Sequence, residues 1–507
     1  MLPPLIITLD LSTTACKAIA WGPRGQLIAQ GRAPLQMLRP AANAYEQAPE
    51  AWWAAAQEAL RQLFAEVPAR GVAALAITTQ RESVALTGAD DQPLRPAMLW
   101  LDERRKAEVS ALCQRLPNLH AVSGKPCDWS PAVFSLAWLA RHEPALFAQV
   151  RHVYDPHAWL VRQLTGEFAT SWASACPFGC FDITHYRWAD EVLQALPLAA
   201  SHFPPAQAPG SLLGEVSAAA AASTGLPAGT PLIAGGGDGQ AGGLGSGVVR
   251  PGLAYLNLGT AIVSGVYSPS ARIAPAFRTL CALDREGYIL ETSLRSGTLL
   301  ISSLLRQFFN IDLAQQPERL PRLERRAARV PAGSGGLLLL PYWNGVMNPH
   351  WDADARGCLL GLSPDHGRGH LYRAVLEGIA LEQALATHAV EAATGQAVQA
   401  FVAMGGGAAS RLWCQIFANI CDRPLLRAAT QEASSLGAGM AAAVGVGWYS
   451  SFGEAAAAMA PSGERFEPHA ALRGFHQELL GLYRDLYPSV RALYPRLARL
   501  AAGPGTP

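Results

Sequence analysis

Short apolar runs alternate with longer amphipathic segments along most of the chain. The runs 5–9 and 17–21 lie on either side of the polar stretch 10–14, and this pattern predicts two strands joined by a tight turn. After Pro49 the large apolar side chains recur with the spacing of one helix face, and residues 73–78 form another buried-strand candidate. Strands that alternate with helices predict an α/β fold.

The second half of the chain contains a weak echo of the first. Predicted strands at 253–258 and 262–267 flank the small polar turn Gly259-Thr260, much as the opening strands flank their own turn. A predicted helix at 371–390 continues the α/β pattern beyond this hairpin. The two halves are therefore expected to have related architectures.

Glycine and proline cluster at residues 245–252, which predicts a domain boundary there. A chain of 507 residues also requires two domains, because single cores stop growing near about 250–300 residues. We therefore predict one domain over residues 1–247 and another over residues 248–507. Small ligands commonly bind between domains, so an interdomain cleft is the expected place for a site.

The charge balance argues against polyanionic partners. Lys and Arg number 40 and Asp and Glu 39, which gives a net charge of +1 and no electrostatic case for nucleic acid or a membrane surface. No stretch approaches the roughly 18 apolar residues of a membrane span, and the first residues lack the features of a signal peptide. We expect neither nucleic acid nor membrane as a partner.

Cysteine usage gives an expectation about the compartment. The nine cysteines are scattered and include no CxxC pair. Cys176 and Cys180 are the closest couple, and without a matching His or Cys pair nearby they are expected to be reduced core thiols. These features predict a cytoplasmic protein.

The first motif that could carry chemistry is the opening turn, Asp10 to Thr14 with Lys17. Small hydroxyl residues on a tight turn, here Ser12, Thr13 and Thr14, leave backbone N–H groups free to bind phosphate oxygens. A carboxylate at the strand end can hold a hydrated Mg²⁺, which makes Asp10 the candidate metal ligand. The alternative is a plain polar hairpin.

The second motif is the turn Gly235-Gly236-Gly237-Asp238-Gly239 after an apolar strand. Glycines allow close backbone approach and can place one carboxylate at the mouth of a cleft. Asp238 could there accept the proton of an alcohol that attacks phosphorus. The alternative is an Asp that caps a helix, because a plausible helix start follows it.

The third motif is Gly405-Gly406-Gly407, between a predicted strand at 401–404 and a predicted helix at 411–420. Glycines at a strand-to-helix turn suit the flat approach of a nucleotide base or ribose, although a simple tight turn is the alternative. The chain contains no GxxxxGK[ST] pattern, and no GxGxxG opens a helix after the first strand. This argues against a P-loop kinase and a Rossmann dehydrogenase.

The fourth motif is Gln80-Arg81-Glu82 after the predicted strand 73–78, together with Trp100 and Asp102. A guanidinium, a carboxylate and an amide can hydrogen-bond vicinal hydroxyls, and an indole can stack on the C–H face of a sugar. A surface ion pair is the alternative. The motif predicts a site for a small sugar or polyol.

Taken in order along the chain, these motifs resemble those of the FGGY carbohydrate kinases, the group that contains xylulokinases and glycerol kinases. The opening hairpin resembles the first phosphate motif of the family, residues 257–264 its second, and Gly236-Gly237-Asp238 the turn of its catalytic base. Residues 404–424 resemble the adenosine motif, and 348–357 with 371–378 resemble the C-terminal signature region. The resemblance covers nearly the whole chain.

This resemblance implies two actin-like domains of the ribonuclease-H type flanking an interdomain cleft, with ATP and Mg²⁺ as cofactors. It implies Asp238 as the base and Asp10 as the residue that positions Mg²⁺. Phosphate oxygens would be held by both hairpin turns, and adenosine would lie beside the glycine turn. The residues concerned are Ser12, Thr13, Thr14, Lys17, Gly259 and Thr260 for phosphate, and Gly405, Gly406 and Gly407 for adenosine.

The expected reaction is transfer of the γ-phosphate of MgATP to a hydroxyl of a small ketose, with D-xylulose as the expected substrate. Glycerol or another polyol is the alternative, because Gln80-Arg81-Glu82 resembles the polyol site of glycerol kinases more than that of xylulokinases. An actin- or chaperone-type ATPase is the alternative from a different class. A homodimer is one option that the sequence leaves open.

Overall fold

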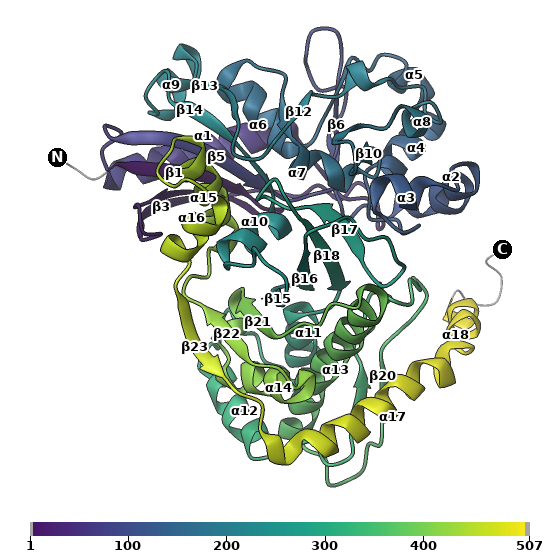
Figure 1. Cartoon of the computed structure of the whole chain (residues 1–507). Helices are drawn as coiled ribbons and strands as arrows, with labels where there is room; N and C mark the ends of the chain where they lie inside the picture. The colour runs from purple at the N-terminus through teal and green to yellow at the C-terminus, as the bar shows by residue number, and fades with distance from the viewer. Residues whose placement is uncertain (1–3, 502–507) are drawn as a thin grey trace.

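The computed structural model of the protein describes residues 4–501, and its strands form two large sheets in separate halves of the molecule (Figure 1). The first sheet has the order β13-β14-β5-β1-β2-β3. β1 pairs antiparallel with β2 and parallel with β5, which places Asp10 opposite both Lys17 and Thr78. Its strands are β1 (Leu5–Leu11), β2 (Ala15–Trp21), β3 (Leu27–Pro34), β5 (Val72–Thr79), β13 (Leu212–Glu215) and β14 (Pro231–Gly237).

The second sheet repeats this arrangement and has the order β17-β18-β16-β15-β21-β22-β23. β15 pairs antiparallel with β16 and parallel with β21, as β1 does with β2 and β5. The echo in the sequence therefore corresponds to a repeat in strand pairing. The strands are β15 (Leu253–Leu258), β16 (Ile262–Ser268), β17 (Arg278–Cys281), β18 (Tyr288–Leu294), β21 (Ala400–Met404), β22 (Leu425–Ala428) and β23 (Ser462–Phe466).

Helices cover both sheets, and the predicted ones form close to their expected bounds. The helix expected after Pro49 is α1 (Pro49–Glu66), the one expected at 371–390 is α13 (Arg368–Thr394), and the one expected at 411–420 is α14 (Arg411–Cys421). The other main helices are α2 (Val109–Arg115), α4 (Val133–His142), α6 (Pro156–Thr165), α9 (Ala218–Thr224), α10 (Asp238–Gly245), α11 (Thr298–Phe309), α12 (Arg319–Ala328), α15 (Ala433–Gly445), α16 (Phe452–Met459), α17 (Arg473–Arg491) and α18 (Tyr494–Ala501).

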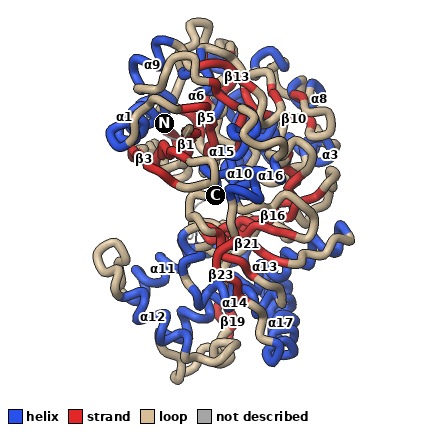
Figure 2. Tube along the Cα trace, turned by 60° about the vertical axis from the view of Figure 1, so that its left-hand side comes forward, coloured by secondary structure: helices blue, strands red, loops and turns tan. Residues whose placement is uncertain are grey.

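Two helices, α10 and α15, lie between the sheets and cross with their backbones in contact (Figures 1 and 2). A Cβ atom added to Gly245 would lie 1.9 Å from the carbonyl oxygen of Ala433, and one added to Gly437 would lie 1.9 Å from that of Ala241. No side chain fits at either position. The crossing therefore depends on the absence of side chains there.

α15 belongs to the second half of the chain but packs against the first sheet. The hydroxyl of Ser435 lies 2.6 Å from that of Thr8, and the indole Nε1 of Trp21 donates to Ser435 Oγ at 3.0 Å. Apolar side chains of α15 and α16 share one buried cluster with those of β1, β2, β5 and β14. Chain order and packing therefore do not coincide at this point.

The cysteines differ in part from expectation. Cys176 and Cys180 are buried free thiols, as predicted. The sequence did not reveal that Cys113, on α2, forms a disulfide with Cys127, in the loop before α4, although their Cα atoms lie 6.2 Å apart. Isolated cysteines 14 residues apart carry no recognisable spacing signal.

Within residues 4–501, none of the helices combines the length and the apolarity needed to cross a membrane. The two longest, α13 and α17, both carry charged side chains along their length.

We predict that Gly437→Ala lowers the free energy of unfolding by about 2 kcal/mol or more, because the new methyl group must push α15 away from α10. Gly481→Ala, within α17, is the matched control, since its Cβ would meet no atom within 4 Å. There alanine should stabilise by up to about 1 kcal/mol through its higher helix propensity. Urea denaturation of the two variants tests this, and equal stabilities would contradict the close crossing.

Candidate active site

Asp238 lies where β14 ends and α10 begins, and glycines bring this turn close to its neighbours. A Cβ on Gly235 would lie 2.0 Å from the carbonyl oxygen of Ile77 on β5, and one on Gly237 would lie 2.5 Å from Cδ of Arg81. The glycines therefore let β14 pack directly on β5 and place Asp238 beside Arg81. Nε of Arg81 lies 3.0 Å from Oδ1 of Asp238. The same oxygen, Oδ1, accepts the Gly239 N–H at 2.7 Å.

Asp238 combines exposure with a raised proton affinity. Its side chain is 45% exposed, whereas that of Arg81 is largely buried. Although the side chain can be reached, the protein atoms around its carboxylate displace water and raise the pKa of Asp238; Arg81 opposes this rise, and the negative charge of Glu291 adds to it. A reachable carboxylate with a raised pKa can serve as a general base.

Arg81 is one member of a chain of five charges, which we call the charge chain: Asp238, Arg81, Glu291, Arg278 and Glu82. Arg81 Nη1 donates to Glu291 Oε2 at 2.9 Å, and Arg278 donates to Oε1 of the same carboxylate. Arg278 Nη1 also donates to Glu82 Oε1 at 2.7 Å. Apart from Asp238, all of these side chains are nearly inaccessible.

Glu291 is the centre of the charge chain and has no exposed surface. Burial alone would raise its pKa, but Arg81 and Arg278 overcome this effect and lower the pKa of Glu291 to about 2. The hydroxyl of Tyr255 donates to its Oε2 at 3.0 Å. Glu291 is therefore held ionised by three groups.

The backbone of Glu82 has φ of +63°, in the left-handed region that a non-glycine residue rarely adopts. The surroundings hold it there: Arg278 binds the carboxylate and Arg105 donates to the carbonyl oxygen at 3.3 Å. Strained residues that their surroundings over-determine are concentrated at functional sites. The conformation of Glu82 supports its candidacy for a site.

Gln80 and Trp100 both bind the opening turn. Thr13 Oγ1 donates to Gln80 Oε1 at 3.0 Å, and the Trp100 indole donates to Thr13 Oγ1 at 2.9 Å. Gln47, which the sequence did not single out, donates to the Thr13 carbonyl at 2.7 Å and accepts from Gln80. The candidate sugar motif and the candidate phosphate turn therefore form one connected network.

Asp102 lies beneath the surface of the candidate site. Its side chain has no exposed surface, its Oδ2 accepts the backbone N–H of Tyr45 at 2.9 Å, and the guanidinium of Arg104 binds the same carboxylate. The carboxylate therefore anchors the local turn, and its role toward a sugar stays a prediction. Adjacent charges in the sequence could not distinguish this role from a binding role.

Asp10 and Lys17 face each other across the opening hairpin. Lys17 Nζ lies 2.6 Å from Oε2 of Glu432, the residue just before α15. Burial raises the pKa of Asp10 to about 7; Lys17 opposes the rise, while Glu432 and Asp238 add to it. Asp10 therefore lies in a region of excess negative charge.

This region fits a divalent cation. A cation near Asp10 would relieve both the burial cost and the repulsion that raise its pKa. In the part of the chain that the structure describes, no three His, Cys, Asp or Glu side chains are grouped to hold a metal ion. Mg²⁺ suits such a site, because it keeps several waters and commonly takes phosphate oxygens as further ligands.

The second hairpin turn and the glycine turn lie together at one end of the second sheet. Gly297 and Thr298 donate their backbone N–H groups to the carbonyls of Thr260 and Gly259, at 2.8 and 2.9 Å. A Cβ on Gly407 would lie 2.8 Å from the carbonyl oxygen of Leu258, at the end of β15. The turn that could hold phosphate and the turn that could hold adenosine are therefore neighbours.

Gly406 differs from the glycines on either side of it. A Cβ on Gly406 would meet no atom within 4 Å, whereas one on Gly405 would lie 2.4 Å from Asn257 Oδ1 and one on Gly407 would lie 2.5 Å from the Trp413 ring. Gly405 and Gly407 are explained by packing. Of these three glycines, only Gly406 has open space where its side chain would be, and a ligand could lie there.

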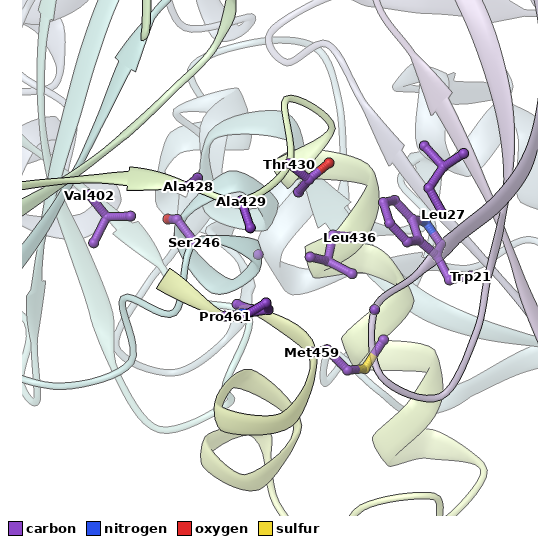
Figure 3. Close-up of a pocket in the computed structure, with 13 residues that line it drawn as sticks. Trp21, Leu27, Ser246, Val402, Ala428, Ala429, Thr430, Leu436, Met459 and Pro461 are labelled. Carbon is purple, nitrogen blue, oxygen red and sulfur yellow. The ribbon is translucent and has the colours of Figure 1, made fainter. Parts of the chain in front are cut away.

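A cavity of about 220 Å³ lies elsewhere (Figure 3). Its walls are mostly apolar and include Trp21, Leu27, Leu436 and Met459. Trp21 ends β2, at the opposite end of that strand from the turn 12–14. None of the sequence-predicted site residues lines this cavity, so it is distinct from the candidate active site.

Comparison with known proteins agrees with this geometry. Residues 5–245 match the N-terminal domain, and residues 254–446 the C-terminal domain, of the FGGY family of carbohydrate kinases. The xylulose kinase of Escherichia coli K12 is 32% identical over 429 residues, covering 83% of this chain and 86% of that protein. An autoinducer-2 kinase of Yersinia enterocolitica is 29% identical over 491 residues, covering 93% and 92%.

The crystal structure of a xylulose kinase from Rhodospirillum rubrum superimposes with a TM-score of 0.88 at 28% identity, covering 97% of this chain and 99% of that one. The two repeated sheets and the helices between them have the architecture of actin-like ATPases. The chain belongs to the FGGY family of carbohydrate kinases and is a sugar phosphotransferase.

Proposed function

We propose that this enzyme transfers the γ-phosphate of MgATP to a hydroxyl of D-xylulose. The observation that carries the proposal is the position of Asp238, an accessible carboxylate with a raised pKa beside Arg81. The substrate is supported by the relatives from Escherichia coli and Rhodospirillum rubrum, which are both named xylulose kinases.

Asp238 acts in this proposal as the general base. It accepts the proton of the attacking hydroxyl while that oxygen forms a bond to phosphorus. Gln80, Arg81 and Glu82 bind neighbouring hydroxyls, and Trp100 forms part of the wall of the sugar site. Asp102 supports the turn from behind, because its carboxylate is already fully engaged.

The phosphates of ATP bind at the two hairpin turns. The backbone N–H groups of Thr13 and Thr14 serve one side, in a turn that the Ser12 N–H closes by donating to the Ala15 carbonyl at 2.9 Å, and those of Gly259 and Thr260 serve the other. Lys17 is bound to Glu432 in this structure, and its positive charge also lowers the pKa of Asp10. We assign it to the phosphate site on this ground. Gly405, Gly406 and Gly407 flank adenosine. Asp10 would hold Mg²⁺, which would supply positive charge to neutralise the phosphates.

A polyol is the second candidate substrate, favoured by Glu82. Its backbone is strained and its buried carboxylate binds Arg278 within the charge chain, which forms a compact charged site suited to a short polyol. Turnover should be measured with D-xylulose, other pentuloses, glycerol and autoinducer-2, with ATP hydrolysis followed in parallel. D-xylulose should give the highest kcat/KM. ATP hydrolysis that no sugar accelerates would instead indicate an ATPase of the actin or chaperone type.

A cytoplasmic location is also part of the proposal; there the Cys113–Cys127 pair would be kept as two thiols. A homodimer stays an open option. A kinase that consumes ATP is expected where ATP is made and held. Light scattering on the purified chain, at several concentrations, would test the oligomeric state directly.

We predict that Asp238→Asn lowers kcat by about 10²-fold or more, because positioned proton transfer is lost, while ATP and sugar still bind. Asparagine caps helices about as well as aspartate, so a purely capping role would survive this change. Asp155→Asn is the matched control, since Asp155 caps α6 through the Ala158 N–H. A kcat above about a tenth of wild type would remove Asp238 from the role of base.

Asp10 should make stability depend on pH. The pKa of Asp10 is raised from 3.8 to about 7 in the folded protein, so folding favours the protonated carboxyl. This contribution to the free energy of unfolding is fully present below about pH 4 and is lost as the pH rises through about 7. Asp10→Asn should therefore gain Tm relative to wild type between pH 5 and pH 8. MgATP should raise the Tm of wild type more than that of the variant. A pH-independent difference would contradict this assignment.

Gly406→Val should raise the KM for ATP by about tenfold or more while the KM for sugar and the Tm stay near wild type. The new side chain enters open space, so it obstructs a ligand without displacing protein atoms. Gly407→Val gives the contrast, because it must displace the Trp413 ring and should lower the Tm. If Gly406→Val changed only the KM for sugar, the adenosine assignment would fail.

A further inference from the structure

The charge chain passes back and forth between the two halves of the molecule. Arg81 and Glu82 follow β5 and Asp238 follows β14, all at the edge of the first sheet. Glu291 on β18 and Arg278 on β17 belong to the second sheet. Within the charge chain, the ion pairs that connect Arg81 to Glu82 therefore run through Glu291 and Arg278, which belong to the other half.

Arg81 could in principle form a closed pair with Asp238. A guanidinium beside a carboxylate favours two parallel hydrogen bonds, one to each oxygen. Here Nε of Arg81 lies beside Oδ1 of Asp238, and Nη1, on the other side of the guanidinium, binds Glu291 and fixes how the group is turned. Among residues 4–501, no hydrogen bond is made to Oδ2 of Asp238, which leaves that oxygen for a substrate proton.

Glu291 is suited to hold Arg81 in this position. It is fully buried, so its charge is poorly screened, and Arg278 and the Tyr255 hydroxyl fix its orientation. A Cβ on Gly239 would lie 2.8 Å from Glu291 Oε2 and 3.0 Å from Cζ of Arg81, so the turn of the base packs directly on this contact. A shift of Glu291 would therefore move Arg81 relative to Asp238.

We propose that Glu291 is a positioning residue of the phosphoryl transfer: it draws Arg81 away from a closed pair with Asp238 and so keeps the base free to accept a proton. The inference rests on the proposed function of Asp238. It means that the half of the molecule that binds adenosine controls the base on the sugar side.

A buried ion pair that only joins the two halves would look similar in a static structure. The two roles differ in what happens when Arg81 can no longer bridge. Lysine keeps the charge but is a point charge without the two-way geometry of the guanidinium. If Glu291 acts through Arg81, its removal should matter much less once Arg81 is lysine.

The experiment is a double-mutant cycle on kcat with the best sugar. Glu291→Gln should lower kcat by about 10- to 100-fold while the KM for ATP changes less than about twofold. Added to Arg81→Lys, the same change should cost no more than about twofold. Full additivity of the two losses would overturn the proposal, and so would an unchanged kcat in the single variant.

The matched control is Glu377→Gln. Arg373 and Glu377 form a comparably buried pair on α13, with Nε and Oε1 2.6 Å apart, and Glu377 also accepts from the Ser334 hydroxyl; neither residue belongs to the charge chain. This variant should lose thermal stability and keep its kcat. If Glu291→Gln does not fold, Tyr255→Phe takes its place in the cycle, because it removes one group that orients Glu291.

Failure of the inference can be told from failure of the proposed function. Wild-type turnover that no sugar stimulates, or full activity in Asp238→Asn, would overturn both. Sugar-dependent turnover that is lost in Asp238→Asn, combined with additive losses in the cycle, would overturn the inference alone.

Discussion

The backbone contact between α10 and α15 fixes the geometry on which the site depends. α10 begins at Asp238 and α15 begins just after Glu432, so the crossing of the two helices sets the distance between these carboxylates. The hydroxyl of Ser434, in the first turn of α15, donates to the carbonyl oxygen of Asp238 at 2.8 Å. The contact between α10 and α15, which glycines make possible, thus positions Asp238 relative to Glu432. It also fixes the two sheets relative to each other.

The charge chain serves the site at a cost in the free energy of unfolding. It holds three carboxylates and two guanidiniums, four of them nearly inaccessible. Removing charges from water is costly, and buried ion pairs often stabilise a fold less than apolar side chains of the same size would. Control of Asp238, as proposed above, gives this costly arrangement a role that strength of the interface between the halves would not.

The sequence predicted what local patterns encode. The opening hairpin, the repeat at β15 and β16, and the helices α1, α13 and α14 follow from apolar spacing and turn residues, so their existence and approximate bounds were accessible. The glycine turns were also recognisable. Arg278 and Glu291 were not, because their partners lie up to 210 residues away and only the three-dimensional fold brings them together. Glu291 left one signal, a single charge within the apolar strand YILETSL.

The disulfide between Cys113 and Cys127 has a practical consequence for work on this enzyme. Cys127 precedes Asp128, whose carboxylate binds Arg295 just beyond β18 at 2.9 Å, so the linked loop is part of the contact between the halves. Reducing agents in a buffer would convert this link into two free thiols and leave the loop held by non-covalent contacts alone. Preparations made with and without dithiothreitol are then different covalent species, and their kinetic constants are comparable only after the thiols of each have been counted.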